Sequence, residues 1–205
     1  MKIKRPLILL LIACFISSCS SIGGNNRSSV NATQQASEWI EEAAVYSALI
    51  SSRYIQGDVQ LIVIRDHTGL DPQDDLEMRL EYVRMNMPEL TQAMVTDFKD
   101  KNEEPFPLSS KLDLDTQYAL ISQERWQQIF TATDLDGDWE EFYRIYPNSQ
   151  GILTLSRVGF NNNLDMALVY VGNQSGGLAG AGYYLLMAKE NNTWKVIRED
   201  MAWIS

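Results

Sequence analysis

The chain has little cysteine and almost no histidine, with two cysteines and one histidine among its 205 residues. Zinc centres in proteins are built mainly from those side chains, and a thiol nucleophile requires a free cysteine. Cys14 and Cys19 both lie within the first twenty residues, in a segment that we expect to be processed. We therefore expect a mature domain with no metal site, no cofactor and no disulfide.

Basic side chains are also few. The chain carries 17 lysines and arginines against 27 aspartates and glutamates, which gives a formal net charge of −10. A protein that binds nucleic acid needs a basic face to neutralise phosphates, so this balance argues against nucleic acid as a partner. Residues 151–205 contain four acidic and four basic side chains, so the acidic excess lies before residue 151. The N-terminal helices are thus the surface where a charged partner would bind.

The apolar run at the N-terminus is too short to cross a membrane. Residues 7–16 are almost all apolar, and they follow Lys2, Lys4 and Arg5. A bilayer core requires about twenty apolar residues in a helix. A basic start followed by a short apolar segment is typical of a secretory signal peptide, so we expect the chain to be exported.

The residues that follow, Ile16-Ser17-Ser18-Cys19, resemble the bacterial lipobox. This resemblance implies that residues 1–18 are removed and that Cys19 is acylated, which would anchor the protein to a membrane through its lipid. Ser20 would then direct the lipoprotein to an outer membrane, facing the periplasm, in a host with two membranes. Two alternatives stay open: a lipobox at residues 11–14, and a plain signal peptide or uncleaved anchor.

Removal of the signal peptide would leave a mature chain with a formal charge of −13. Residues 20–37 are small and polar and contain a single charge, so we expect the lipidated cysteine and a flexible tether over 19–37. The remaining residues, 38–205, fit one folded domain.

Helices dominate the first part of this domain. A helix over about 38–55, with Ser37 as its N-cap, would bury an apolar face of large side chains that begins at Trp39. Pro72 is expected to start a second helix that ends before Pro88, and a third follows over 89–101. The remaining expected elements are strands over 59–64 and 118–121, a helix over 123–130, and a buried aromatic stripe over 139–146. The alternative is that this stripe and Trp39 line a sugar or lipid pocket.

The hydrophobic period changes to two after Gly151. Strands are expected over 152–158, 166–171, 183–188 and 194–197, with 201–204 extending the last strand or forming a fifth. The sequence therefore predicts an α+β fold in which N-terminal helices pack on a C-terminal antiparallel β-meander of four to five strands.

The single histidine offers the clearest catalytic hypothesis. Asp66 and His67 directly follow the expected strand over 59–64. Histidine is the usual general base near neutral pH, so a small pocket near these two residues would be the place for chemistry. The alternative is a surface or hydrogen-bonded structural histidine, and no serine of the chain lies in a nucleophile-elbow motif.

Two further motifs invite ligand-binding hypotheses. Residues 134–138 (DLDGD) alternate carboxylates as calcium loops do, but the EF-hand register would place Tyr143 where a bidentate glutamate is required. We favour the interpretation that this segment is an Asp-rich turn before the aromatic helix. The alternative is an irregular loop that binds a cation. Residues 176–182 (GGLAGAG) are expected to form a long hairpin loop, with a flexible ligand-contacting loop as the alternative.

The C-terminal region resembles a module of uncharacterised exported bacterial proteins. The stretches that carry this resemblance are SRVGF at 156–160, ALVYVG at 167–172, GAGYY at 180–184 and KENNTWKV at 189–196. The last of these is also similar to the closing hairpin of NTF2-like α+β domains. The resemblance brings no functional residue with it.

Taken together, these features predict a membrane-anchored exported lipoprotein that acts as a non-catalytic binding or envelope-associated module. An envelope protein or a small ligand is the expected partner. The alternative is a small NTF2-like ligand-binding or enzymatic domain that uses a pocket near His67.

Overall fold

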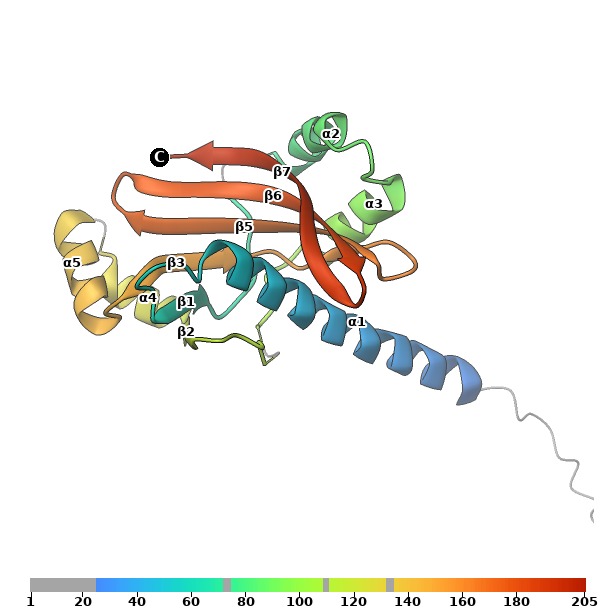
Figure 1. Ribbon diagram of the computed structural model, residues 1–205, viewed down its shortest axis with the longest axis horizontal. Coiled ribbons are helices and arrows are strands. Elements are labelled where there is room, and N and C mark those ends of the chain that lie inside the picture. Colours follow the sequence, from blue (N-terminus) through green and yellow to red (C-terminus); the bar gives the residue numbers. More distant parts are fainter. Residues whose placement is uncertain (1–24, 72–74, 109–110, 132–134) are drawn as a thin grey trace, which may run out of the picture. The chain divides into compact units, whose positions relative to one another are not determined.

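The computed structural model describes residues 25–71, 75–108, 111–131 and 135–205 (Figure 1). The chain divides at Gln35, and Ala36–Ser205 forms one compact unit. This unit begins close to the domain boundary that the sequence predicts. The expected signal peptide, both cysteines and the expected lipobox lie outside the described residues.

Helix α1 spans Asn25–Arg53, so it begins thirteen residues before the expected position. Ser37 lies within the helix and is not its N-cap, and the segment predicted to be a tether is helical from Asn25 onward. Residues 25–37 contain neither glycine nor proline. A helix that is already nucleated extends through such residues at little cost, because each added residue gains a hydrogen bond.

Four shorter helices follow, and polar side chains set the start of three of them. Asp75, Thr91 and Ser122 are N-caps that accept hydrogen bonds from the backbone N–H three residues later. The helix predicted from Pro72 thus begins after Asp75, and residues 72–74 are outside the description. The four helices are α2 (Leu76–Asn86), α3 (Gln92–Lys101), α4 (Gln123–Ile129) and α5 (Leu135–Ile145).

The strands form one mixed seven-stranded sheet, which confirms the α+β class. Its order is β2-β1-β3-β5-β6-β7, and β4 pairs with β5. The strands are β1 (Leu61–Arg65), β2 (Gln117–Ile121), β3 (Ser149–Leu155), β4 (Gly159–Phe160), β5 (Met166–Gly176), β6 (Ala179–Glu190) and β7 (Thr193–Ile204).

The predicted antiparallel meander corresponds to β3, β5, β6 and β7, with 201–204 extending the last strand. The sheet is larger than four to five strands because β1 pairs in parallel with both β2 and β3. Parallel partners are joined through crossover connections rather than hairpins, so local turn signals do not reveal them.

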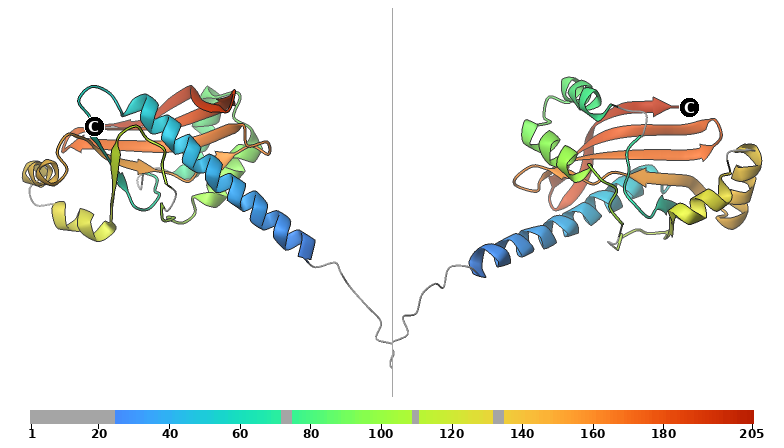
Figure 2. Two further views of the ribbon diagram at one scale, coloured as in Figure 1. Left: turned by 60° about the horizontal axis from the view of Figure 1, so that its bottom comes forward. Right: turned by 180° about the vertical axis from the view of Figure 1, so that it is seen from behind.

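Helices cover both faces of this sheet, and residues alternate between the faces as strand geometry requires. Ile62, Ile64 and Val169 pack toward α1, whereas Val63 and Leu168 pack toward the opposite face. On that opposite face α2 and α3 cover one part of the sheet, and α4 and α5 cover another (Figure 2). The predicted aromatic stripe belongs to the core between the sheet and helices α4 and α5, where Trp139 and Phe142 are buried.

The glycine run is mostly strand, not the long loop expected from sequence. β5 ends at Gly176 and β6 begins at Ala179, so the hairpin is tight. The Trp203 indole packs on Gly182, where a Cβ would lie 2.2 Å from the indole Nε1. The same Nε1 donates a hydrogen bond to the Tyr170 hydroxyl at 2.8 Å. The glycines make room for this ring.

Candidate binding groove along helix α1

Three glutamates near the start of the compact unit attach α1 to other elements. Each forms an ion pair with a different partner, at N–O distances of 3.0, 2.6 and 2.8 Å. The pairs are Glu38 with Lys101, Glu41 with Lys189, and Glu42 with Arg157. These carboxylates therefore fix α1 in place and do not add to an open acidic surface.

Glu42 is the most enclosed of the three. Its Oε1 accepts hydrogen bonds from Arg157 Nε at 2.8 Å and from the Val158 N–H at 2.9 Å. The Tyr46 hydroxyl lies 2.9 Å from the same oxygen and 2.7 Å from the carbonyl oxygen of Ser156, and it donates to either. Burial, and then the negative charge of Glu42, raises the pKa of Tyr46 well above its ordinary value.

An open, largely apolar groove of about 750 Å³ runs along α1. Its lining on α1 spans Ala36 to Ser51, a rise of about 22 Å in a straight helix. The lining residues are Ala36, Trp39, Ile40, Ala43, Ala44, Ser47, Ala48, Ser51, Lys111, Asp113, Asn192, Thr193 and Trp194.

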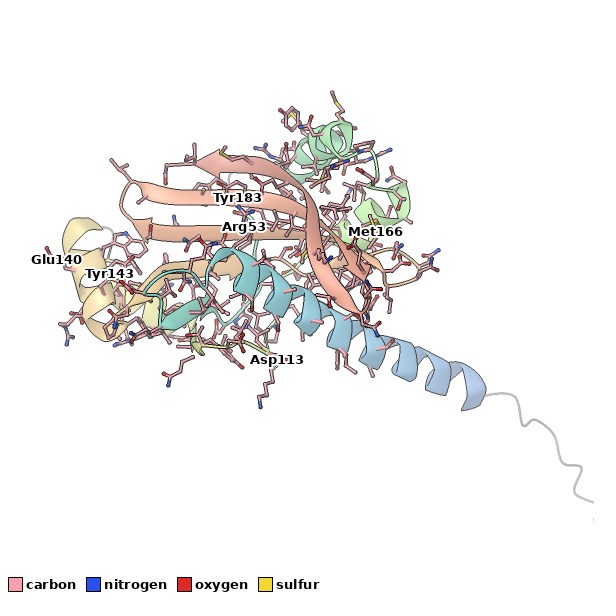
Figure 3. The ribbon with its side chains drawn as sticks, viewed as in Figure 1. Arg53, Asp113, Glu140, Tyr143, Met166 and Tyr183 are labelled. Carbon is pink, nitrogen blue, oxygen red and sulfur yellow. The ribbon has the colours of Figure 1, made fainter. Side chains whose placement is uncertain are left out.

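Small side chains form the floor of this groove, and larger groups form its walls. The alanines and serines at positions 43, 44, 47, 48 and 51 recur at helical spacing along α1. One wall comes from Lys111 and Asp113, and the Asp113 N–H donates to Ser47 Oγ at 2.9 Å (Figure 3). Residues 192–194, at the turn between β6 and β7, also line it.

Two large apolar side chains at the groove remain open to solvent. Trp39 is 45% exposed and Ile40 is 69% exposed. The prediction that Trp39 lies on the buried face of the helix is therefore wrong, whereas Tyr46 and Ile50 on that face are buried. The spacing of apolar residues does not mark this difference, because the adjacent residues Val45 and Tyr46 of the same helix are both buried.

The structure places Asp66 and His67 at the surface. His67 Nδ1 lies 2.9 Å from Asp66 Oδ1, and the imidazole side chain is 51% exposed. The backbone on both sides is fixed, since Leu108 N–H donates to the Asp66 carbonyl and Thr68 N–H donates to the Phe106 carbonyl. The groove along α1 is lined by other residues, so the two predicted pocket residues do not contribute to it.

The Asp-rich segment is helical where it is described. Asp134 lies outside the described residues, and α5 begins at Leu135, so residues 135–138 form a first helical turn and not the expected loop. Asp138 is buried, and its two oxygens accept from Thr131 N–H at 2.8 Å and from Thr131 Oγ1 at 3.2 Å. Protein donors therefore already engage this carboxylate.

Within the described part of the chain, no three side chains of the metal-ligating types come together. None of its helices combines the length and the apolar character that crossing a bilayer requires.

The compact unit is strongly acidic as a whole. Ala36–Ser205 contains all 27 acidic side chains and 13 of the 17 basic ones, for a formal charge of −14. Because Lys101, Lys189 and Arg157 are paired with α1, they do not offset the other carboxylates. The potential around the unit is therefore negative and attracts cations. Comparison with protein-family models, with curated proteins and with solved structures found no match to the chain.

Proposed function

We propose that this protein is an exported, lipid-anchored binding module that seats a cationic, amphipathic helix of an envelope protein in the groove along α1. The observation that carries the proposal is the open apolar groove itself, with Trp39 and Ile40 exposed beside a floor of small side chains. Contiguous exposed apolar surface of this kind marks interaction sites.

The shape of the groove favours a helix as occupant. Small residues at i, i+4 and i+8 let a second helix approach closely, and the groove length of about 22 Å matches roughly four helical turns. An amphipathic helix lays its apolar side chains into such a groove. Trp39, which is 45% exposed, would then act as the kind of large aromatic anchor that dominates many interfaces.

The charge of the unit favours a basic partner. With a formal charge of −14, the unit accelerates encounter with cations and disfavours acidic partners. Among the described residues that line the groove, only Lys111 and Asp113 are titratable, so this lining is close to neutral. Recognition would therefore combine apolar contact within the groove with long-range attraction from the surrounding surface.

The proposed membrane attachment and location rest on the N-terminal sequence. Acylation of Cys19 would attach the protein to the envelope, and Ser20 favours the outer membrane. Replacing Cys19 by alanine in the native host and following incorporation of labelled palmitate tests this part. We expect labelling to be lost, and unchanged labelling of Cys19→Ala would contradict the anchor.

Binding is tested with the full chain in nanodiscs of zwitterionic lipid, with empty nanodiscs as the blank. The probe is a fluorescent lysine–leucine amphipathic peptide of about fifteen residues, compared with the same peptide carrying glutamate in place of lysine. We expect the lysine peptide to bind at least about tenfold more tightly, with affinity that falls as salt rises.

Matched variants separate the groove from other apolar surface. Ile40→Ser is expected to weaken binding about tenfold, because a large aliphatic side chain would no longer be buried. Ile204→Ser provides the control, since Ile204 is 72% exposed but lies at the end of β7. Equal affinity for both peptides, or equal effects of the two variants, would overturn the proposal.

A further inference from the structure

A second, polar cavity lies at the C-terminal end of α1. α1 ends at Arg53, and the end of β5 and the start of β6 extend past this end of the helix (Figure 1). The cavity measures about 560 Å³. It is lined by Ser52, Arg53, Tyr54, Gln56, Asn173, Ser175, Ala179, Gly180, Ala181 and Tyr183.

Arg53 is held rigidly at this cavity. Its guanidinium carbon lies 4.6 Å from the centre of the Tyr183 ring, and its Nη1 pairs with Glu199 Oε2 at 2.5 Å (Figure 3). The stack and the ion pair fix the direction of the remaining N–H donors. Because Glu199 balances the guanidinium charge, the cavity offers donors without a net positive charge.

The end of α1 argues against a charged ligand. The last carbonyl groups of a helix carry the negative end of its dipole, which disfavours anions. Ser52 and Gln56 lie at this end, and the Gln56 side chain donates to the Ser52 carbonyl at 3.3 Å. A cation would in turn meet the Arg53 guanidinium. A neutral ligand avoids both penalties.

The lining is matched to a ligand rich in hydroxyl groups. The hydroxyls of Tyr54 and Tyr183 can donate to a ligand. Those of Ser52 and Ser175 donate to backbone carbonyl groups of the protein, so they offer acceptors. Asn173 and Gln56 supply amides, and Asn173 Oδ1 accepts no hydrogen bond from any described residue. Asn173 Nδ2 donates to the Gln150 carbonyl at 3.3 Å, so a ligand donor that reaches Oδ1 while this bond is kept removes the cost of an unsatisfied acceptor.

We propose that this cavity binds a neutral saccharide. Each saccharide hydroxyl both donates and accepts, as the lining does, and the small residues Ala179, Gly180 and Ala181 leave room for a ring beside β6. The site shares no lining residue with the groove along α1, so it stands whether or not that groove seats a helix.

The test uses the full chain, labelled with ¹⁵N and held in zwitterionic nanodiscs, titrated with chitotriose, maltotriose, inorganic phosphate and argininamide. At about 20 mM ligand, a site of millimolar affinity is largely occupied. We expect at least one saccharide to shift the backbone amide signals of Gln56, Asn173 and Tyr183. We expect neither phosphate nor argininamide to do so.

Matched variants locate the site. Tyr183→Ala removes both a hydroxyl and the support of Arg53, and it should weaken saccharide binding about tenfold. Gln56→Ala should weaken it less, and Gln128→Ala, an exposed glutamine on α4, should leave it unchanged. If neither saccharide shifts these amides, or if phosphate shifts them more strongly, the inference is overturned. Retained binding in Tyr183→Ala, with its fold confirmed by the remaining spectrum, would also overturn it.

Discussion

Glu42 of α1 and Arg157, which lie 115 positions apart in the sequence, form an ion pair in which Arg157 Nε lies 2.8 Å from Glu42 Oε1. The side chains are only 9% and 11% exposed, respectively. The Arg157 guanidinium also stacks on Phe106, 4.3 Å from the ring centre. This pair joins the helix that forms the groove floor to the chain that follows β3, so it holds the groove in shape.

Replacing Glu42 by alanine should destabilise the protein by about 3 kcal/mol, because Arg157 and the Val158 N–H would both lose an acceptor in an enclosed place. Urea unfolding followed by circular dichroism measures the change. Glu81→Ala is the matched control, since Glu81 is exposed on α2, and its effect should stay within about 0.5 kcal/mol. Equal losses for the two variants would contradict the structural role of the ion pair.

Alkaline pH should destabilise the protein through Tyr46. Its pKa is raised in the folded state by burial and by Glu42, so the folded state retains the phenol proton after the unfolded chain, with a pKa of about 10, has lost it. This stabilisation is complete below about pH 10 and is lost as the pH rises further.

Tyr46→Phe removes that proton from both states. The dependence of unfolding free energy on pH above about 10 should therefore become shallower by up to about 1.4 kcal/mol per pH unit. Burial also raises the pKa of Tyr54 and Tyr143, so some slope remains in the variant. Urea titrations between about pH 9.5 and 11.5 measure the slopes. An identical slope in the wild type and in Tyr46→Phe would contradict this prediction.

Gly182→Ala should displace the Trp203 indole, because the new Cβ would lie 2.2 Å from Nε1. The hydrogen bond to Tyr170 would be lost, and we expect a destabilisation of about 1–3 kcal/mol together with a changed near-ultraviolet circular dichroism signal. Gly69→Ala is a suitable control, since its Cβ would make an ordinary 3.4 Å contact with Thr154 Cγ2. An unchanged aromatic signal in Gly182→Ala would refute the proposed contact.

Local sequence patterns predicted those parts of the fold that depend on neighbouring residues. The change from helical to alternating periodicity near Gly151 indicated the antiparallel strands, and the apolar faces of α2 and α3 are buried as expected. The parallel pairing of β1 with β2 and β3 was missed, because those partners are far apart in the chain. The prediction of a long loop over the glycine run was wrong for the same reason, since Trp203, which packs on the run, lies about twenty residues later.

The candidate sites were harder to predict than the fold. Asp66 and His67 were predicted as pocket residues from their residue types, yet they form a local pair at the surface. The groove along α1 depends on small side chains, which carry no chemical signature, and on walls from two distant segments. The spacing of apolar residues along α1 does not mark Trp39 and Ile40 as exposed, since the adjacent pair Leu49 and Ile50 is buried.

The central claim is that the groove along α1 seats a cationic amphipathic helix, and site-specific photocrosslinking tests it most directly. A benzophenone amino acid replaces Ile40 in the full chain in nanodiscs, and a second protein carries it in place of Met85, which is 80% exposed on α2. After illumination with the lysine–leucine peptide, we predict strong crosslinking from position 40, little from position 85, and suppression by the unlabelled peptide. Equal crosslinking from the two positions, or none from position 40, would contradict the account.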